Sequence, residues 1–353
     1  MKILADASLP GLLNAFPKPF EVTLYNHNDD VANLLPDQEI LLCRSTLQVN
    51  KTLLTNHSLR FVATASSGVD HIDLSTIQAE NIRLLDAKGS NANAVADYVL
   101  ACTAYLQKFK KFRGQKAGIM GLGAVGSQVA KRLKAINFHI CCYDPPKNKE
   151  EERFNSCSLT ELLECDLICI HANLHDLPPY PSRLLIAEPE LSLLKANTAI
   201  INASRGDIVS EKALLNLNTP LFYCTDVYSN EPNISDEIID FSSLCTPHIA
   251  GHSLEAKAAA VFMISQKLHY YYQLPFPDYQ RIKIQDSFFF NQQYSWQEQV
   301  LSLYNPIHET HGLKQAPDRK AAFLKLRKAH QHRHDFCASD RHIFNERRLM
   351  SYT

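Results

Sequence analysis

The sequence predicts an α/β protein with two doubly wound parallel-sheet domains, followed by a small α+β domain at the carboxyl end. Three observations predict this fold. Short β-rich runs alternate with longer helical patterns from the first residues onward. The alternation is interrupted by one helical stretch after residue 90 and then begins again, and the pattern changes in kind beyond Pro275 and Pro277. A chain of 353 residues also exceeds what one hydrophobic core usually serves.

The first two domains are predicted from runs rich in β-branched and other apolar residues, separated by turns and helical patterns. From 93 to 108 the apolar residues recur at helical spacing, and this stretch divides the runs into two sets. The strands expected in the first set are 2–5, 22–25, 40–43, 61–65 and 82–85, and those in the second are 117–120, 139–143, 166–170, 198–202, 221–227 and 244–246.

A further helical pattern, 253–271, is ended by Pro275 and Pro277, because a proline cannot continue a helix. Beyond it lie the only tryptophan, Trp296, and a basic, helix-like run at 318–334. A segment this small buries little apolar surface alone, so we expect it to dock on its own chain or on a second copy. We therefore divide the chain into 1–92 with 252–272, 93–251, and an oligomerisation domain at 278–353.

The composition excludes several classes of protein. With 36 basic and 37 acidic residues the net charge is −1, which offers no general attraction for nucleic acid or an anionic membrane. The chain turns polar at Asp6 before a signal-peptide core could form, and no apolar run approaches 18 residues, so we expect a cytoplasmic protein. None of the ten cysteines forms a Cys-x-x-Cys pair, and we predict reduced, buried thiols and no metal site.

A glycine-rich loop, Gly121-Leu122-Gly123-Ala124-Val125-Gly126, follows one expected strand and leads into a helical pattern. In that context the glycines permit a tight turn and a close approach of the backbone to a pyrophosphate, whose charge is met by the helix N-terminus. Asp144 stands at the end of the next strand, where its carboxylate can accept hydrogen bonds from both adenosine ribose hydroxyls. Because that charge would repel a 2′-phosphate, the pattern favours NAD over NADP.

An arginine follows the strand expected at 198–202, in Ser204-Arg205-Gly206. It lies at the carboxyl edge of the sheet, where open α/β sheets bind ligands. A guanidinium at that place can hold a carboxylate through two hydrogen bonds and also polarise a neighbouring carbonyl. Arg205 is therefore a candidate for binding an acidic substrate.

A glutamate and a histidine complete the candidate catalytic set. Glu231 precedes Pro232 in the loop after the strand 221–227, and His248 lies in Thr246-Pro247-His248-Ile249-Ala250-Gly251, directly after the strand 244–246. A histidine that takes a proton from an alcohol works best when a carboxylate fixes its tautomer and stabilises the imidazolium. We therefore predict that His248 is a general base and that Glu231 is its partner.

The order of these motifs over 1–270 resembles the NAD-dependent D-2-hydroxyacid dehydrogenase family. The resemblance implies two Rossmann-like domains with an active site in their cleft, and catalytic roles for Arg205, Glu231 and His248. Where that family usually has His-Thr-Pro-Leu beside the nicotinamide ribose, this chain has His171-Ala172-Asn173-Leu174. The NAD-binding residues that the resemblance implies are Gly121, Gly123, Ala124, Val125, Gly126, Asp144, Ala203, Asp226 and Gly251.

Other segments resemble one branch of this family. These segments are 43–46, 251–257 and parts of 278–353; the branch oxidises a phosphorylated hydroxy acid and forms homodimers through its third domain. His252 stands where that branch generally carries a tyrosine that touches the substrate. The substrate contacts implied are Ser45, Ser66 and His252, with Ser67 and Gly68 in the loop whose amides hold the substrate carboxylate, and Arg44 is the first candidate for the phosphate.

Two alternatives stay open from the sequence. The first is another member of the same family, acting on 3-phosphoglycerate or D-lactate. The second is a non-catalytic, NAD-sensing protein similar to the C-terminal-binding-protein corepressors, which keep the catalytic residues. Residues 278–353 are typical of a folded, aromatic-containing segment rather than a disordered partner-binding tail, and this favours an enzyme.

Overall fold

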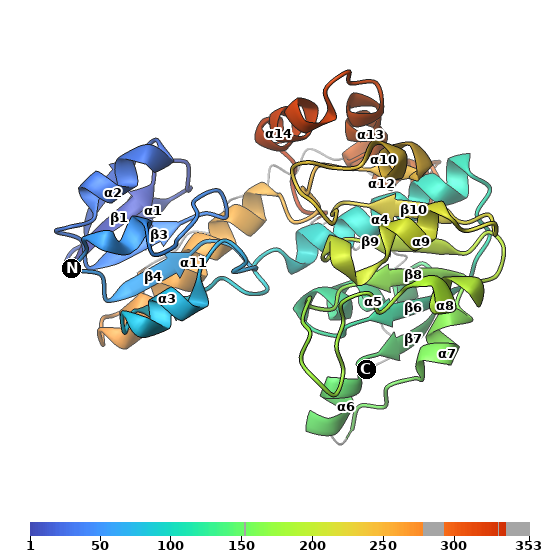
Figure 1. The fold of residues 1–353 in the computed structure, drawn as a ribbon, viewed down its shortest axis with the longest axis horizontal. Helices are drawn as coiled ribbons and strands as arrows, with labels where there is room; N and C mark the ends of the chain where they lie inside the picture. The colour runs from blue at the N-terminus through green and yellow to red at the C-terminus, as the bar shows by residue number, and fades with distance from the viewer. Residues whose placement is uncertain (152, 278–292, 331, 337–353) are drawn as a thin grey trace. The chain divides into compact units, whose positions relative to one another are not determined.

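The structure, a computed structural model, describes residues 1–151, 153–277, 293–330 and 332–336 (Figure 1). It divides into two compact units. The first comprises Met1–Asn91 and Ser253–Gln285, and the second comprises Ala92–His252 and Asp286–Thr353. The division of the chain into three domains remains a prediction.

The first unit is built on a five-stranded parallel sheet with the order β2-β1-β3-β4-β5. All four residues of both β3 and β4 are buried, as expected when helices cover both faces of a parallel sheet. One core packs against α1 and α11, and the other includes Val31 of α2 and Ile77 of α3. The elements are β1 (Lys2–Asp6), α1 (Leu12–Ala15), β2 (Glu21–Tyr25), α2 (Val31–Leu34), β3 (Ile40–Cys43), β4 (Phe61–Thr64), α3 (Leu74–Ala79), β5 (Arg83–Leu85) and α11 (Leu254–Tyr271).

The second unit contains a six-stranded parallel sheet with the order β11-β10-β9-β8-β6-β7. Its strands are β6 (Lys116–Met120), β7 (His139–Tyr143), β8 (Leu167–Ile170), β9 (Ala199–Asn202), β10 (Phe222–Thr225) and β11 (Leu244–Cys245). Its helices up to residue 252 are α4 (Ala92–Phe109), α5 (Ala124–Ala135), α6 (Pro145–Glu150), α7 (Leu159–Leu163), α8 (Glu188–Ser192), α9 (Glu211–Leu215) and α10 (Asp236–Phe241). The two parallel sheets confirm the predicted fold class.

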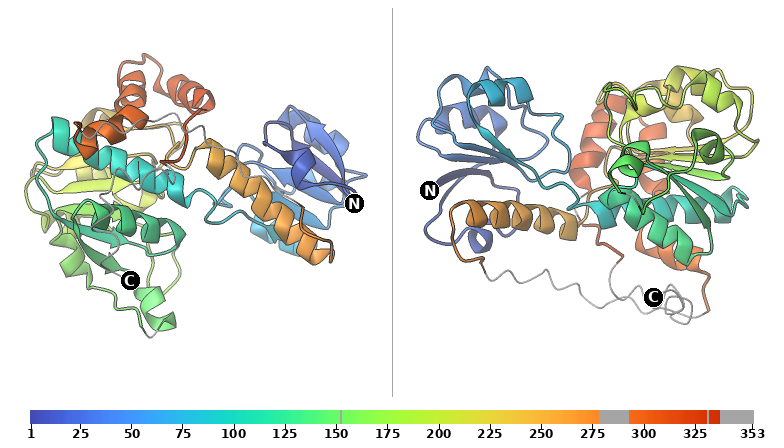
Figure 2. Two further views of the ribbon diagram at one scale, coloured as in Figure 1. Left: turned by 180° about the vertical axis from the view of Figure 1, so that it is seen from behind. Right: turned by 90° about the horizontal axis from the view of Figure 1, so that it is seen from below.

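Three further helices of this unit come from the carboxyl-terminal segment: α12 (Trp296–Leu303), α13 (Ile307–Lys314) and α14 (Arg319–Ala329). Helix α12 packs on α4, as the left view of Figure 2 also shows. Helix α13 lies beside the edge strand β11. The Thr310 hydroxyl of α13 donates to the Cys245 carbonyl and accepts from the Cys245 amide, both at 3.0 Å. The described part of this segment contains helices and no strand, and 278–292 and 337–353 lie outside the described residues.

Two general properties of the chain follow from these elements. Within the described residues, no helix combines the length and the apolar character needed to cross a membrane. The cysteines of the described residues are free thiols, and several, including Cys43, Cys102 and Cys169, are fully buried in the cores. The prediction of reduced, buried thiols is thus confirmed for these three positions.

Candidate active site

The glycine-rich loop joins β6 to α5, as the sequence predicts. Gly121 has a φ of 85°, and a Cβ added to it would lie 2.6 Å from the Ala172 amide nitrogen, so only glycine fits there. A Cβ on Gly126 would overlap the Gly121 carbonyl, whereas nothing lies within 4 Å of the Cβ position of Gly123. The loop is therefore packed on its inner side and open at Gly123, next to the first amides of α5, and this arrangement fits a pyrophosphate.

Asp144 follows β7 and caps the amino end of α6. Its carboxylate accepts hydrogen bonds from the Lys147 amide (3.1 Å) and from the Leu122 amide in the glycine-rich loop (2.7 Å). Both bonds fix the carboxylate at the carboxyl edge of the sheet, beside the loop that follows β6. The structure thus brings Asp144 to the glycine-rich loop, as expected for a residue that binds the adenosine ribose.

Arg205 follows β9, the strand next to β10 in the sheet. Its carbonyl accepts from Asn202 Nδ2 at 2.9 Å, and its Nη1 donates to the Ser204 carbonyl at 2.7 Å. A Cβ on Gly206 would overlap the backbone of Tyr228, so the turn after Arg205 lies directly against the loop after β10. The Ser204 hydroxyl in turn donates to the Ala172 carbonyl, which links this turn to the segment that packs on Gly121.

His248 and Glu231 are in direct contact. His248 Nδ1 lies 2.7 Å from Glu231 Oε2, and Glu231 Oε1 accepts from the Tyr228 amide at 3.0 Å. Burial by itself would raise the pKa of the Glu231 carboxyl, but the charge and hydrogen bond of His248 and the Tyr228 amide bring this pKa below its ordinary value. An ionised carboxylate only accepts, so His248 Nδ1 carries the hydrogen and Nε2 can accept a proton.

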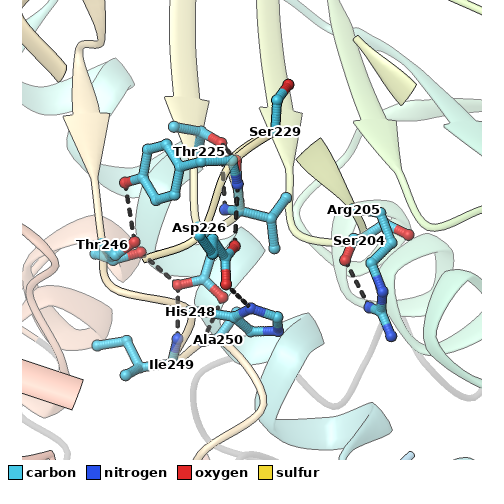
Figure 3. Close-up of polar contacts among 12 residues, drawn as sticks. Ser204, Arg205, Thr225, Asp226, Ser229, Thr246, His248, Ile249 and Ala250 are labelled. Atoms are coloured by element: carbon cyan, nitrogen blue, oxygen red, sulfur yellow. Dashed lines mark hydrogen bonds and ion pairs between the residues drawn. The ribbon is translucent and has the colours of Figure 1, made fainter. Parts of the chain in front are cut away.

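The loop that carries His248 is held by Asp226, a residue at the end of β10 (Figure 3). The Asp226 carboxylate is 1% exposed and accepts from the Thr246 hydroxyl (2.6 Å) and the amides of Ile249 and Ala250 (2.8 Å each). These bonds support the left-handed conformation of His248, whose φ is 55°. The sequence predicts that Asp226 contacts the cofactor, and that contact remains a prediction. Its hydrogen bonds show that it also organises the loop of His248.

Three residues that the sequence did not single out also hold this loop. The Tyr98 hydroxyl lies 2.8 Å from the Thr246 hydroxyl, and the Tyr228 hydroxyl donates to the Thr246 carbonyl at 3.0 Å. Arg333, from the carboxyl-terminal segment, donates through Nη2 to the Ala250 carbonyl at 2.5 Å. The sequence offered no signal for Arg333, because it lies within a basic run that is indistinguishable from a solvated helix face.

The arrangement places the catalytic candidates after three neighbouring strands. Arg205 follows β9, Glu231 follows β10 and His248 follows β11, and these strands are adjacent and parallel. Ala203 directly follows β9, and Gly251 and His252 close the His248 loop, where the His252 amide donates to the Ile249 carbonyl at 2.8 Å. A guanidinium, an ionised carboxylate and an imidazole with one accepting nitrogen are the groups needed to bind and oxidise a hydroxy acid.

The predicted substrate residues of the first unit also follow its strands. Arg44 and Ser45 come directly after β3, and Arg44 Nη1 donates to the Ser8 hydroxyl at 2.6 Å. Ser66, Ser67 and Gly68 come after β4; the Ser66 carbonyl accepts from the Ala87 amide at 3.1 Å, and the Ser67 hydroxyl donates to Asn91 Oδ1 at 2.7 Å. Their contact with substrate remains a prediction.

Comparison with known proteins agrees with this geometry. Residues 98–250 match the family described as D-isomer specific 2-hydroxyacid dehydrogenase, NAD binding domain. An erythronate-4-phosphate dehydrogenase of Legionella pneumophila is 55% identical over 336 residues, which cover 95% of each chain. A protein of the same name from Coxiella burnetii is 32% identical over 352 residues, covering 96% of this chain and 94% of that one.

Solved structures share the fold. The NAD⁺-bound 3-phosphoglycerate dehydrogenase of Entamoeba histolytica has a TM-score of 0.65 at 22% identity, covering 80% of this chain and 99% of that one. The NAD complex of a formate dehydrogenase from Staphylococcus aureus has a TM-score of 0.63 at 24% identity, covering 79% and 98%. From the family match, the full-length relatives and the site, the chain belongs to the D-isomer-specific 2-hydroxyacid dehydrogenases that use NAD, in their erythronate-4-phosphate dehydrogenase branch.

Proposed function

We propose that this NAD-dependent oxidoreductase converts 4-phospho-D-erythronate to 2-oxo-3-hydroxy-4-phosphobutanoate, a step in the biosynthesis of pyridoxal 5′-phosphate. The observation that carries the proposal is the contact between His248 Nδ1 and Glu231 Oε2, at 2.7 Å, beside the strand end that carries Arg205. The choice of substrate is supported by the erythronate-4-phosphate dehydrogenase of Legionella pneumophila, which aligns with 95% of the chain.

His248 is the general base of the proposed reaction. Its Nε2 takes the proton of the C2 hydroxyl as the C2–O bond becomes a carbonyl. The positive charge that develops on the imidazole is stabilised by the Glu231 carboxylate at Nδ1, which also fixes the tautomer that leaves Nε2 able to accept. The glycine-rich loop would hold NAD, which would supply the acceptor for the hydride that leaves C2.

Arg205 binds the substrate carboxylate in this proposal. A guanidinium can form two parallel hydrogen bonds with a carboxylate, which fixes the orientation of the neighbouring C2. Its position after β9, next to the strand that leads to Glu231, brings the anion-binding group to the same edge of the sheet as the base, which follows β11. Orientation of this kind contributes to the rate because it holds the reacting atoms close to their transition-state arrangement.

The residues proposed to hold NAD lie in the glycine-rich loop and in the segments that follow β7, β9, β10 and β11. Gly121 and Gly126 give the loop its shape, and Gly123, Ala124 and Val125 present the first turn of α5 to the pyrophosphate. Asp144 binds the adenosine ribose, and Ala203 and Gly251 border the cofactor near the catalytic residues. We propose that Asp226 acts mainly by holding the loop that ends at Gly251.

A substrate panel tests this proposal. Purified protein is mixed with NAD and with 4-phospho-D-erythronate, 3-phosphoglycerate or D-lactate, and NADH formation is followed by absorbance. The highest kcat/KM is expected with 4-phospho-D-erythronate. A higher value with 3-phosphoglycerate or D-lactate would assign the protein another substrate of the same family.

We also propose a homodimer formed through residues 278–353, as the resemblance to this branch implies. Light scattering on the eluting protein would then give twice the chain mass of 39.9 kDa. A chain that ends before residue 278 is expected to elute as a monomer. A dimer of this shortened chain would place the interface elsewhere.

A further inference from the structure

Two cationic side chains of the first unit, Arg44 and Lys257, belong to the same edge of its sheet. The strands β1, β3 and β4 are adjacent and parallel, so the residues that follow them meet at one edge. Arg44 directly follows β3 at this edge. Lys257 comes from a distant part of the sequence, in the first turns of α11.

The direction of α11 brings Lys257 to that edge. At the carboxyl end of the helix, the Tyr272 hydroxyl donates to Glu39 Oε1 at 2.7 Å, and Arg60 Nη2 donates to the Tyr271 hydroxyl at 3.0 Å. Glu39 and Arg60 immediately precede β3 and β4, so this end of α11 lies at the amino edge of the sheet. The helix therefore runs antiparallel to the strands.

The length of α11 carries its other end past the strands. Its 18 residues span about 27 Å, whereas a strand of four or five residues spans about 13–17 Å. Ala260 and Val261 pack in the same core as Ala5, Leu42 and Ala63, which lie in the last two residues of β1, β3 and β4. Lys257 is one turn nearer the amino end, and it reaches the level of the loops that follow the strands.

Charge and burial agree with this placement. Lys257 is half-buried, and its pKa is lowered first by this burial and then by the positive charge of Arg44. Asp6, the last residue of β1, is bound by the Ser8 amide at 2.9 Å and by the Ser8 hydroxyl at 2.5 Å. That same hydroxyl accepts from Arg44 Nη1 at 2.6 Å, so Asp6 orients the guanidinium through Ser8.

We propose that Arg44 and Lys257 together bind the phosphate group of the substrate, with the Ser45 hydroxyl beside them. The proposal rests on the function proposed above and adds Lys257 as a residue that determines specificity. A phosphate monoester carries close to two negative charges at neutral pH, and two cations match it. The guanidinium supplies planar, bidentate donors, and the ammonium supplies a compact point charge.

The test compares Lys257→Met with Lys267→Met, a matched change on the same helix, where Lys267 pairs with Asp86 instead. Lys257→Met is expected to raise the KM for 4-phospho-D-erythronate by about tenfold or more, with a smaller change in kcat. It should weaken competitive inhibition by inorganic phosphate to a similar degree and leave the turnover of unphosphorylated D-erythronate unchanged. Lys257→Arg should retain most of the affinity, and Lys267→Met should keep the wild-type KM.

Circular dichroism and NADH titration are used to check that each variant is folded and binds cofactor. A Lys257→Met protein with wild-type KM and wild-type inhibition by phosphate would overturn the site while leaving the proposed function intact. The proposed function can also fail while the phosphate site holds. In that case the wild-type enzyme would prefer 3-phosphoglycerate, and its KM for that acid would still depend on Lys257. A loss of D-erythronate turnover equal to the loss for the phosphorylated acid would also overturn the phosphate assignment.

Discussion

His248 Nδ1 and Glu231 Oε2 are 2.7 Å apart, and the pKa of the Glu231 carboxyl lies below its ordinary value. The carboxylate is therefore ionised at neutral pH and accepts the Nδ1 hydrogen. This contact fixes which imidazole nitrogen can act as a base, and it joins two loops that follow the neighbouring strands β10 and β11. The same contact predicts that removal of the Glu231 charge slows proton transfer to His248.

Glu231→Gln should lower kcat by about 10²-fold, because a neutral amide can still orient the ring but does not stabilise the imidazolium. NADH affinity, measured by fluorescence titration, should stay at the wild-type value. Glu211→Gln is a suitable comparison, since Glu211 accepts from the nearby Ser229 amide but does not contact His248. A Glu231→Gln enzyme with wild-type kcat would show that the carboxylate is not needed for proton transfer.

Asp144→Asn tests cofactor choice. The Leu122 and Lys147 amides bind different oxygens of Asp144, so asparagine keeps an acceptor for only one of them, and it removes the negative charge. The ratio of kcat/KM with NADP to that with NAD should rise by about tenfold, because the repulsion of a 2′-phosphate is lost. This ratio is measured in the variant and in the wild type. An unchanged ratio would place the adenosine ribose away from Asp144.

Arg333→Met should lower kcat by about tenfold through a displaced catalytic loop. The arginine donates to the Ala250 carbonyl at 2.5 Å and to the Ala94 carbonyl at 3.0 Å, so it joins α4 to the segment that follows His248. Lys320→Met, an exposed change on α14, serves as the control. If the Arg333 variant is folded and fully active, the carboxyl-terminal segment does not position His248.

The stability of the first unit should depend on pH through Asp73, the N-cap of α3. Hydrogen bonds from the Thr76 and Ser75 hydroxyls and amides lower the pKa of Asp73 to about 2. Because the folded-state pKa lies below the unfolded value of about 3.9, ionised Asp73 stabilises the protein above pH 4. This stabilisation is lost as the pH falls toward 2. Asp73→Ala should therefore lower Tm at pH 7 relative to Asp37→Ala, with a difference that shrinks below pH 4.

The sequence predicted the local features well, and the structure shows why. The expected strands 40–43 and 139–143 agree with β3 and β7. For β3 the reason is that a buried parallel strand is a continuous apolar run bounded by turns. The glycine-rich loop was also predictable, since the positive φ of Gly121 and the close approach of Gly126 to the Gly121 carbonyl are local features that require glycine. Expected strand 221–227 was too long at both ends, because apolar Val227 is buried in a loop rather than in β10.

The supports of the catalytic loop were not predictable from the sequence. Tyr98 and Thr246 are 148 positions apart, and Arg333 and Ala250 are 83 apart. Neither periodicity nor a short motif links such pairs, because their contact depends on how helices pack on the finished sheet. The direction of α11 is of the same kind, since it follows from contacts of Tyr271 and Tyr272 rather than from the helical pattern itself.

We propose that His248 removes the proton of the C2 hydroxyl of 4-phospho-D-erythronate during NAD-dependent oxidation. The most direct measurement is the rate of NADH formation from that acid by the wild type and by His248→Asn, with NADH affinity determined in parallel. Turnover is expected from the wild type, and the variant is expected to lose turnover by about 10²-fold or more with unchanged NADH affinity. Turnover that survives in the variant would place the base elsewhere and contradict the role of His248.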